Sequence, residues 1–117
     1  MFTATVRTVF FAGHQITYTD GTVEDLHEHE WVARAAVKAA VLDDQGFAVD
    51  FLWLKKHLQI ITNGLVTTRL EEHHYFKETK INASAENIAK YIFEELEPLI
   101  KGEAKLVSIE VQESPGC

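Results

Sequence analysis

The first part of the chain alternates between apolar and polar positions with a period close to two. From residue 3 to residue 16, one face would carry Ala4, Val6, Thr8, Phe10, Ala12, His14 and Ile16. Such alternation, in a stretch rich in β-branched and aromatic residues, predicts a strand with one buried side. The sequence Tyr18-Thr19-Asp20-Gly21 predicts the turn that follows it.

Residues 26–42 fit two different elements. As a strand, this stretch would place on one face His27, His29, Trp31, Ala33, Ala35, Val37, Ala39 and Val41. As a helix, it would be capped by Thr22 and would benefit from the high helix propensity of its alanines. The local pattern does not decide between a strand and a helix.

Two helices and a final strand are predicted in the second half of the chain. Asp50 and Ser84 are typical residues for capping the starts of the two helices. Residues 65–80 have no regular period and are predicted to be irregular, whereas residues 106–113 alternate like a strand. This order of elements predicts an α+β fold, formed as a single domain over residues 1–117.

The charge and composition exclude several kinds of partner. With 11 Lys and Arg against 18 Asp and Glu, the formal net charge is −7, and no basic stripe is present, so a nucleic-acid partner is not expected. The sequence has no apolar run of about 18 residues that could span a membrane, and no signal-peptide pattern at its start. The only cysteine is Cys117, so the fold needs no internal disulfide bond. We expect a cytoplasmic protein.

The length of the chain also limits the kind of site it can form alone. A chain of 117 residues buries roughly two thirds of its surface on folding, which allows a core but not a deep private pocket. A site of useful size would need a second subunit as one of its walls. This favours a homo-oligomer.

Three of the six histidines are spaced as metal ligands would be. In a strand, His27 and His29 would point to the same face, and His14 would lie on a neighbouring strand about 4.8 Å away. Three protein ligands with an open fourth position are typical of catalytic zinc sites. The His27–His29 pair also fits an exposed polar position, and in a helix the two rings would diverge.

Several carboxylates could carry out acid–base chemistry beside such a metal. Glu24 lies three residues before His27 and could act as a general base, and Glu72 could orient the ring of His73. Glu113 could accept hydrogen bonds from paired N–H groups at the end of a strand. Each of these carboxylates also fits a solvent-exposed turn, loop or strand end.

Six motifs, spread over nearly the whole chain and occurring in the same order, resemble those of the 6-pyruvoyl-tetrahydropterin synthase and 6-carboxy-tetrahydropterin synthase family. The segments that carry the resemblance are Phe10-Phe11-Ala12-Gly13-His14, His27-Glu28-His29, residues 46–55, residues 70–75, residues 83–89 and Val111-Gln112-Glu113-Ser114. The resemblance implies the tunnelling fold, an antiparallel sheet with two helices on one face, with residues 26–42 as a strand. It also implies that three sheets join into a barrel, so a trimer or hexamer with sites between subunits is expected.

The resemblance assigns roles within the site. The residues that it assigns to Zn²⁺ are His14, His27 and His29. The expected substrate-binding residues are Glu113, for the pterin ring, together with Ser84 and Glu86. Residues 70–75 resemble the segment that supplies a catalytic aspartate and histidine, so Glu72 and His73 are expected to be catalytic.

The departures from the family pattern point to a particular branch. Where the common synthases have a catalytic cysteine, this chain has Val23, and Glu24 fits the Glu-x-x-His pattern of a variant branch. That branch cleaves the side chain of 7,8-dihydroneopterin triphosphate and gives 6-hydroxymethyl-7,8-dihydropterin for folate synthesis. The other departures are Glu28 for glycine, Glu72 for aspartate, Ala83 for proline, and the loss of a final short strand after Glu113.

The expected function is therefore that of a zinc-dependent pterin lyase with Glu24 as general base. Its product would be 6-hydroxymethyl-dihydropterin or a pyruvoyl-type compound. Two alternatives remain open. The loss of the cysteine and the presence of Glu28 favour a non-catalytic or repurposed pterin-binding paralogue. A 6-carboxy-tetrahydropterin synthase-like enzyme is disfavoured by Val23.

Overall fold

The computed structural model describes residues 1–114 and contains three strands, three α-helices and two short 3₁₀ helices. In chain order these are β1 (Phe2–His14), β2 (His27–Ala39), α1 (Phe51–Asn63), η1 (Leu70–Glu72), α2 (His74–Thr79), α3 (Ala85–Leu96), η2 (Glu97–Leu99) and β3 (Lys105–Glu113). The predicted α+β class is confirmed. The predicted loss of a strand after Glu113 concerns residues 115–117, as does Cys117, and these lie outside the described residues.

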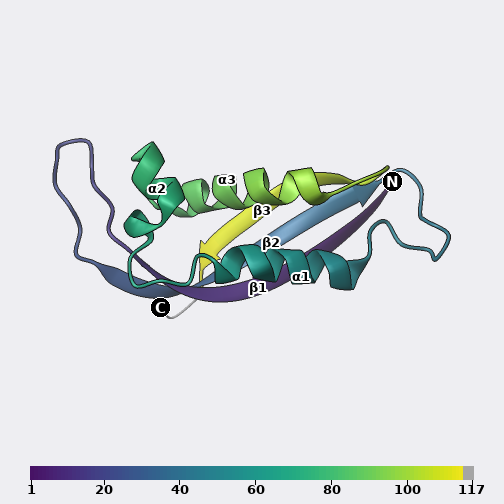
Figure 1. Ribbon diagram of the computed structural model, residues 1–117, viewed down its shortest axis with the longest axis horizontal. Helices are drawn as coiled ribbons and strands as arrows, with labels where there is room; N and C mark the ends of the chain where they lie inside the picture. Colours follow the sequence, from purple (N-terminus) through teal and green to yellow (C-terminus); the bar gives the residue numbers. More distant parts are fainter. Residues whose placement is uncertain (115–117) are drawn as a thin grey trace.

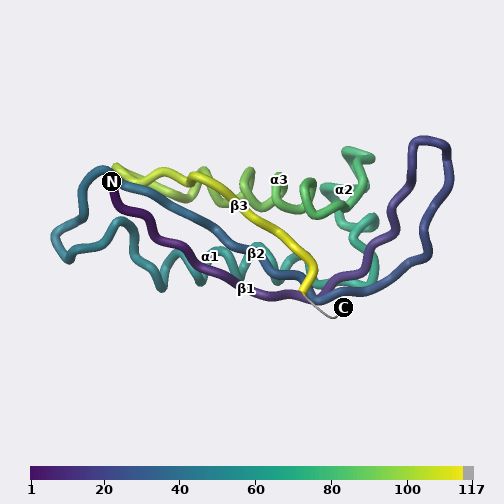
Figure 2. The backbone as a smooth tube through the Cα atoms, turned by 180° about the vertical axis from the view of Figure 1, so that it is seen from behind, coloured from purple at the N-terminus to yellow at the C-terminus, as the bar shows by residue number. Residues whose placement is uncertain are grey.

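The strands form one antiparallel sheet in the order β1-β2-β3, so β2 is the central strand. Helices α1 and α3 lie on the same face of this sheet, α1 over β1 and α3 over β3 (Figure 1). Seen from behind, the other face of the sheet carries no helix formed by residues 1–114 (Figure 2). The molecule therefore has two layers and is elongated, with principal extents of 53 × 28 × 20 Å.

The central position of β2 explains why residues 27–39 form a strand despite their alanines. The side chains that face the helices are fully or almost fully buried, and they are Trp31, Ala33, Ala35, Val37 and Ala39. Small residues here let the helices approach the sheet, and burial of the whole face outweighs the weak local preference of alanine for a helix. The helical interpretation of this stretch is wrong.

The two long helices begin where their capping residues predict. The Asp50 carboxylate accepts a hydrogen bond from the backbone N–H of Trp53 at 3.1 Å, and the Ser84 hydroxyl accepts one from Asn87 at 3.2 Å. Both satisfy N–H groups that the first turn of a helix leaves without a partner. Capping thus fixes the start of α3, which lies beside the candidate site described below.

The prediction that residues 65–80 are irregular is wrong for part of that stretch. It contains η1 and the six-residue helix α2, at whose start a ring nitrogen of His73 accepts from the backbone N–H of Tyr75. Phe76 anchors α2 in the core with 2% exposure. A helix of fewer than two turns is too short to show a helical period in the sequence, so the pattern could not reveal it.

Among residues 1–114, none of the helices is long and apolar enough to cross a membrane.

Gly13, the residue before His14, lies where two segments approach closely. Its backbone N–H donates to the Thr67 carbonyl at 3.0 Å, and a Cβ atom at this position would lie only 1.9 Å from the Thr68 carbonyl oxygen. Because the obstacle is backbone rather than a flexible side chain, a larger residue cannot be accommodated without moving one segment. Gly13 thus allows residues 67–68 to pack against the end of β1.

Replacing Gly13 by alanine should lower the free energy of unfolding by about 1–3 kcal/mol or more, because the added methyl group forces the two segments apart. Urea denaturation measures the change. Gly64→Ala is the matched control, since Gly64 has ordinary helical angles of φ −68° and ψ −13°, and its stability should change by no more than about 1 kcal/mol. Equal stability of the two variants would contradict the steric role of Gly13.

Candidate metal centre

The structure brings the three predicted ligand histidines together at one end of the sheet. His14 and His27 are direct partners in the β1–β2 register, and His29 lies two residues further along β2 on the same face. The ring centroids are separated by 4.6 Å for His14–His27, 5.5 Å for His14–His29 and 4.3 Å for His27–His29. The register of the two strands alone is enough to produce this cluster.

Trp31 forms the apolar floor of the cluster. Its ring meets the His14 and His29 rings edge to face, at centroid distances of 5.0 and 5.7 Å. The indole is completely buried, and its N–H donates to the Ala12 carbonyl at 3.0 Å. The indole therefore has no polar group left to compete for the imidazole nitrogens, and it limits the rotation of two of the three rings.

Backbone carbonyls fix the protonation pattern of His14 and His27. The Nδ1 atom of His14 lies 2.8 Å from the Ala83 carbonyl oxygen, and Nδ1 of His27 lies 2.8 Å from the Asp25 carbonyl oxygen. A carbonyl can only accept, so Nδ1 carries a proton in each ring, and in the neutral form Nε2 has a free lone pair. The two Nε2 atoms lie 2.9 Å apart, a distance at which either a proton shared between them or a bound cation would offset the repulsion of two lone pairs.

The third imidazole, His29, has no hydrogen-bond partner for either ring nitrogen among the described residues, although both atoms are buried. Burial lowers the pKa of His29 below its usual value; the Glu113 carboxylate acts in the opposite direction, and the neighbouring His27 and His14 rings add to the lowering. The ring is therefore held neutral, which is the form that binds a metal. Buried polar atoms without partners call for an explanation, and a metal ion would provide one.

Glu113 joins this group from β3, where it pairs with Trp31. Its carboxylate lies 3.4 Å from Nε2 of His29 and 3.9 Å from Nε2 of His14. One potential ligand atom from each of His14, His27, His29 and Glu113 lies within 4.8 Å of all the others. Three imidazoles with one carboxylate are a donor set that suits Zn²⁺, so the residues present fit the metal that the sequence predicts.

Glu24 faces the same cluster from the loop between β1 and β2. One oxygen of its carboxylate accepts from the backbone N–H of Ile16 at 3.0 Å, and lies 3.9 Å from Nε2 of His14 and 3.8 Å from Nε2 of His27. The hydroxyl of Tyr18 donates to its other oxygen at 3.4 Å. The carboxylate is thus held beside the ligand atoms without being one of the grouped ligands.

The other predicted site residues lie outside the histidine cluster. Ser84 is occupied as the cap of α3, and Glu86 is exposed in the first turn of that helix. The residue of this motif that contacts the cluster is Ala83, through the carbonyl oxygen that holds His14. Glu28, which departs from the family pattern, pairs with Gly13 and is exposed on the opposite face of the sheet from its histidine neighbours.

Helix α2, which His73 precedes, lies at the same end of the molecule as the end of β1 (Figure 1), but His73 and Glu72 are not part of the group of potential metal ligands. Nδ1 of His73 accepts from the backbone N–H of Tyr75 at 3.3 Å, which leaves Nε2 as the protonated nitrogen. Burial lowers the pKa of His73, as does the neighbouring His74. Glu72 is exposed. His73 is therefore a neutral imidazole that presents an N–H donor.

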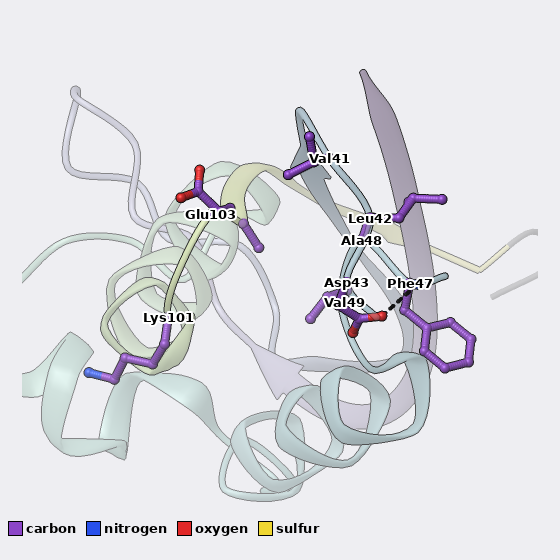
Figure 3. Close-up of a pocket in the computed structure, with 9 residues that line it drawn as sticks. Val41, Leu42, Asp43, Phe47, Ala48, Val49, Lys101 and Glu103 are labelled. Atoms are coloured by element: carbon purple, nitrogen blue, oxygen red, sulfur yellow. Dashed lines mark hydrogen bonds between the residues drawn. The ribbon is translucent and has the colours of Figure 1, made fainter. Parts of the chain in front are cut away.

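A separate pocket lies at the other end of the molecule, between the loop after β2 and the connection that leads into β3 (Figure 3). It has a volume of about 270 Å³ and is lined mainly by apolar side chains such as Val41, Leu42 and Val49. Its shape is set in part by Asp43, which accepts from the backbone N–H of Phe47 at 2.9 Å. No histidine lines it, so it has no part in the chemistry of the cluster.

Known proteins resemble the chain in both sequence and fold. A profile of the family described as 6-pyruvoyl tetrahydropterin synthase matches residues 3–117. A curated Caenorhabditis elegans protein assigned as a 6-pyruvoyl tetrahydrobiopterin synthase is 26% identical over 89 residues, which cover 76% of this chain and 63% of that protein. The chain thus spans less than two thirds of the length of this relative.

Two solved structures show the same fold. The 6-pyruvoyl tetrahydropterin synthase of Caenorhabditis elegans superposes with a TM-score of 0.80 at 22% identity, covering 97% of this chain and 89% of that one. A Plasmodium vivax 6-pyruvoyltetrahydropterin synthase, in a variant with a catalytic glutamate replaced by alanine, superposes with a TM-score of 0.65 at 18% identity, covering 100% and 95%.

These superpositions show that the antiparallel sheet with helices on one face is a fold that the chain shares with these proteins. The profile match extends over nearly the whole chain, from the first strand through the histidine pair to β3. The chain belongs to the 6-pyruvoyl tetrahydropterin synthase family.

Proposed function

We propose that this protein is a zinc-dependent lyase that cleaves the side chain of a dihydropterin, with 7,8-dihydroneopterin triphosphate as the leading substrate. The observation that carries this proposal is the convergence of three imidazoles on one point, with the Glu24 carboxylate held 3.8–3.9 Å from two of their nitrogens. Family membership supports a pterin as the substrate class.

The three histidines would hold the metal, and the backbone would hold the histidines. The carbonyls of Ala83 and Asp25 orient the His14 and His27 rings and make them better ligands, because each accepts a hydrogen bond from the Nδ1–H group. When bound, Zn²⁺ would supply Lewis acidity to a hydroxyl of the substrate side chain.

Glu24 is the proposed general base. Cleavage of the carbon–carbon bond next to the ring-bound carbon requires that a proton leave the neighbouring hydroxyl, and a carboxylate can accept it. The Ile16 N–H and the Tyr18 hydroxyl fix the position of Glu24. Val23, at the position of the usual cysteine, has a side chain that cannot accept a proton. The catalytic glutamate named for the Plasmodium vivax relative supports this kind of base.

Glu113 is the proposed anchor for the pterin ring. Its side chain is 45% exposed, so the carboxylate can turn from the histidines towards a bound ligand. In that position it would accept the paired N–H groups of the ring edge and would leave the fourth metal position open, as catalytic zinc sites require. Ser84 and Glu86, at the start of α3, are proposed to contribute to substrate binding near the same end of the molecule.

His73 and Glu72 are proposed to act in the site of a neighbouring copy. They lie outside the cluster of their own chain, yet the Nε2–H group of His73 is a suitable donor for the carbon that must regain a proton. A site built from two copies also supplies the wall that a chain of 117 residues lacks. We therefore propose a homo-oligomer, with a trimer or hexamer as in the expected barrel.

The purified protein should contain close to one zinc per chain, measured by elemental analysis. His29→Ala should reduce the zinc affinity by about 100-fold or more, because only two of the three imidazole ligands, His14 and His27, would remain to hold the metal. His57→Ala is the control, since His57 lies on α1 and bonds only to the Trp53 carbonyl at 2.9 Å. A zinc content well below one in the parent would favour the non-catalytic paralogue.

Glu24→Gln should reduce kcat for the dihydropterin by about 10²–10⁴-fold, because the amide cannot accept a proton. Zinc content should stay near that of the parent. Product chromatography after incubation with 7,8-dihydroneopterin triphosphate measures the rate. Glu28→Gln, on the opposite face of β2, should behave like the parent. Equal rates for the parent and Glu24→Gln would rule out Glu24 as the base.

Glu113→Gln should weaken pterin binding by about 10- to 100-fold, because a charge-assisted hydrogen bond is replaced by a neutral one. Titration of the zinc-loaded protein with a non-cleavable pterin measures the affinity. Glu110→Gln on the same strand is the control, since Glu110 pairs with Arg34 away from the cluster. If zinc is lost together with pterin affinity, Glu113 is a metal ligand rather than the ring anchor.

A further inference from the structure

Three consecutive backbone N–H groups after His14 donate to side-chain oxygens, two of which come from distant parts of the chain. Gln15 donates to Glu71 at 3.1 Å, Ile16 to Glu24 at 3.0 Å and Thr17 to Asn82 at 3.0 Å. In regular β-structure such groups would bond to a neighbouring strand. Here three side-chain oxygens set the path of the backbone as it leaves the metal-binding strand.

Glu71 is the least expected of the three acceptors. One oxygen of its carboxylate accepts from Gln15, and the other is buried and has no partner among the described residues. Leaving a carboxylate oxygen in this state costs at least about 1–3 kcal/mol. The next residue, Glu72, is exposed and bears no such cost. A destabilising feature that is retained at one of two adjacent glutamates indicates that the hydrogen bond between Gln15 and Glu71 has a functional role.

The Gln15 contact bears directly on Glu24. The next residue, Ile16, donates its N–H to the Glu24 carboxylate at 3.0 Å, and its carbonyl accepts from the Glu24 N–H at 2.9 Å. Both the backbone and the side chain of Glu24 are therefore attached to Ile16. Any displacement of Gln15 is passed through one peptide unit to Glu24 and, in the other direction, to His14.

The segment that carries Glu71 is itself tied to the end of β1. The Thr67 carbonyl accepts from the N–H of Gly13 at 3.0 Å, and the absence of a side chain at Gly13 lets the Thr68 backbone pass against it. Leu70, just before Glu71, is completely buried. The backbone that carries Glu71 is thus fixed in position, so the Glu71 side chain can hold the residues after His14 in place.

We propose that Glu71 is a positioning residue of the metal centre, which holds the residues after His14 so that Glu24 faces the ligand nitrogens. This proposal rests on the proposed function, because Glu24 is the base there. The sequence predicts that Glu72 orients the ring of His73. The role proposed here belongs to the adjacent residue, Glu71, and the groups that it orients are Glu24 and His14. Glu71 acts through Gln15 and Ile16 and does not touch the substrate.

Four variants of the zinc-loaded protein test this role. Glu71→Ala removes the acceptor, Glu71→Asp withdraws it by one methylene, and Glu71→Gln keeps an acceptor oxygen. Glu78→Ala is the matched control, since Glu78 is exposed on α2. Hydrogen exchange of the peptide that spans residues 13–18 should become at least about 10-fold faster in Glu71→Ala and Glu71→Asp. In Glu71→Gln and Glu78→Ala it should stay near the parent rate, because the Gln15 hydrogen bond persists.

The same variants should also differ in kcat or in zinc affinity. Glu71→Ala and Glu71→Asp should lose about 10- to 100-fold in kcat or in zinc affinity by chelator competition, as expected when the support of a metal site is removed, with KM little changed. Glu71→Gln should recover most of this loss. If Glu71→Ala does not fold, Glu71→Asp is compared with Glu78→Asp instead.

Two results would overturn the proposal. One is parent-like exchange and zinc affinity in Glu71→Ala and Glu71→Asp, and the other is a Glu71→Gln variant as impaired as Glu71→Ala. Failure of the proposed function looks different, because the parent would then show no turnover of any pterin. Zinc affinity and exchange would still report on Glu71, and a 10-fold difference between Glu71→Ala and Glu78→Ala would support its positioning role.

Discussion

The pairing register of β1 with β2 is the constraint on which the site depends. Side chains alternate between the two faces of a strand, so a shift of one residue would send His27 and His29 to the side of the sheet away from His14. In the observed register His14 and His27 are direct partners. The position of the candidate metal centre is therefore decided by strand pairing, before any loop or helix contributes.

Several contacts make that register firm at the end where the site lies. The buried Trp31 side chain bonds across to the Ala12 carbonyl, and the Thr67 carbonyl adds a further bond to Gly13. The other end of the sheet, near the pocket lined by Val41 and Val49, has no such cross-links among the contacts described. The chain thus concentrates its specific polar contacts near the histidines and leaves the rest of the sheet to apolar packing, as expected when a site must be held rigidly.

The parts of the site that could be predicted from the sequence are those that depend on local spacing. His27 and His29 are two residues apart, so a strand places them on one face, and the family resemblance identified β2 as that strand where its alanines left the question open. The Ala83 carbonyl and the Glu71 carboxylate could not be predicted, because they reach β1 and the residue after it from 69 and 56 positions away. A backbone carbonyl also leaves no mark on the sequence, since every residue has one. The short helix α2 was missed because six residues cannot establish a period.

Nδ1 of His73 caps the start of α2, so the stability of this helix end depends on the protonation state of the His73 ring. Nδ1 of His73 accepts from Tyr75 only while it is unprotonated, and the pKa of His73 is lower in the folded chain than its usual 6.5. For a histidine with a depressed pKa, the stabilisation is complete above pH 6.5 and is lost as the pH falls towards the lower folded value. The start of this helix will therefore loosen in mild acid, and the imidazole that is freed will be a cation.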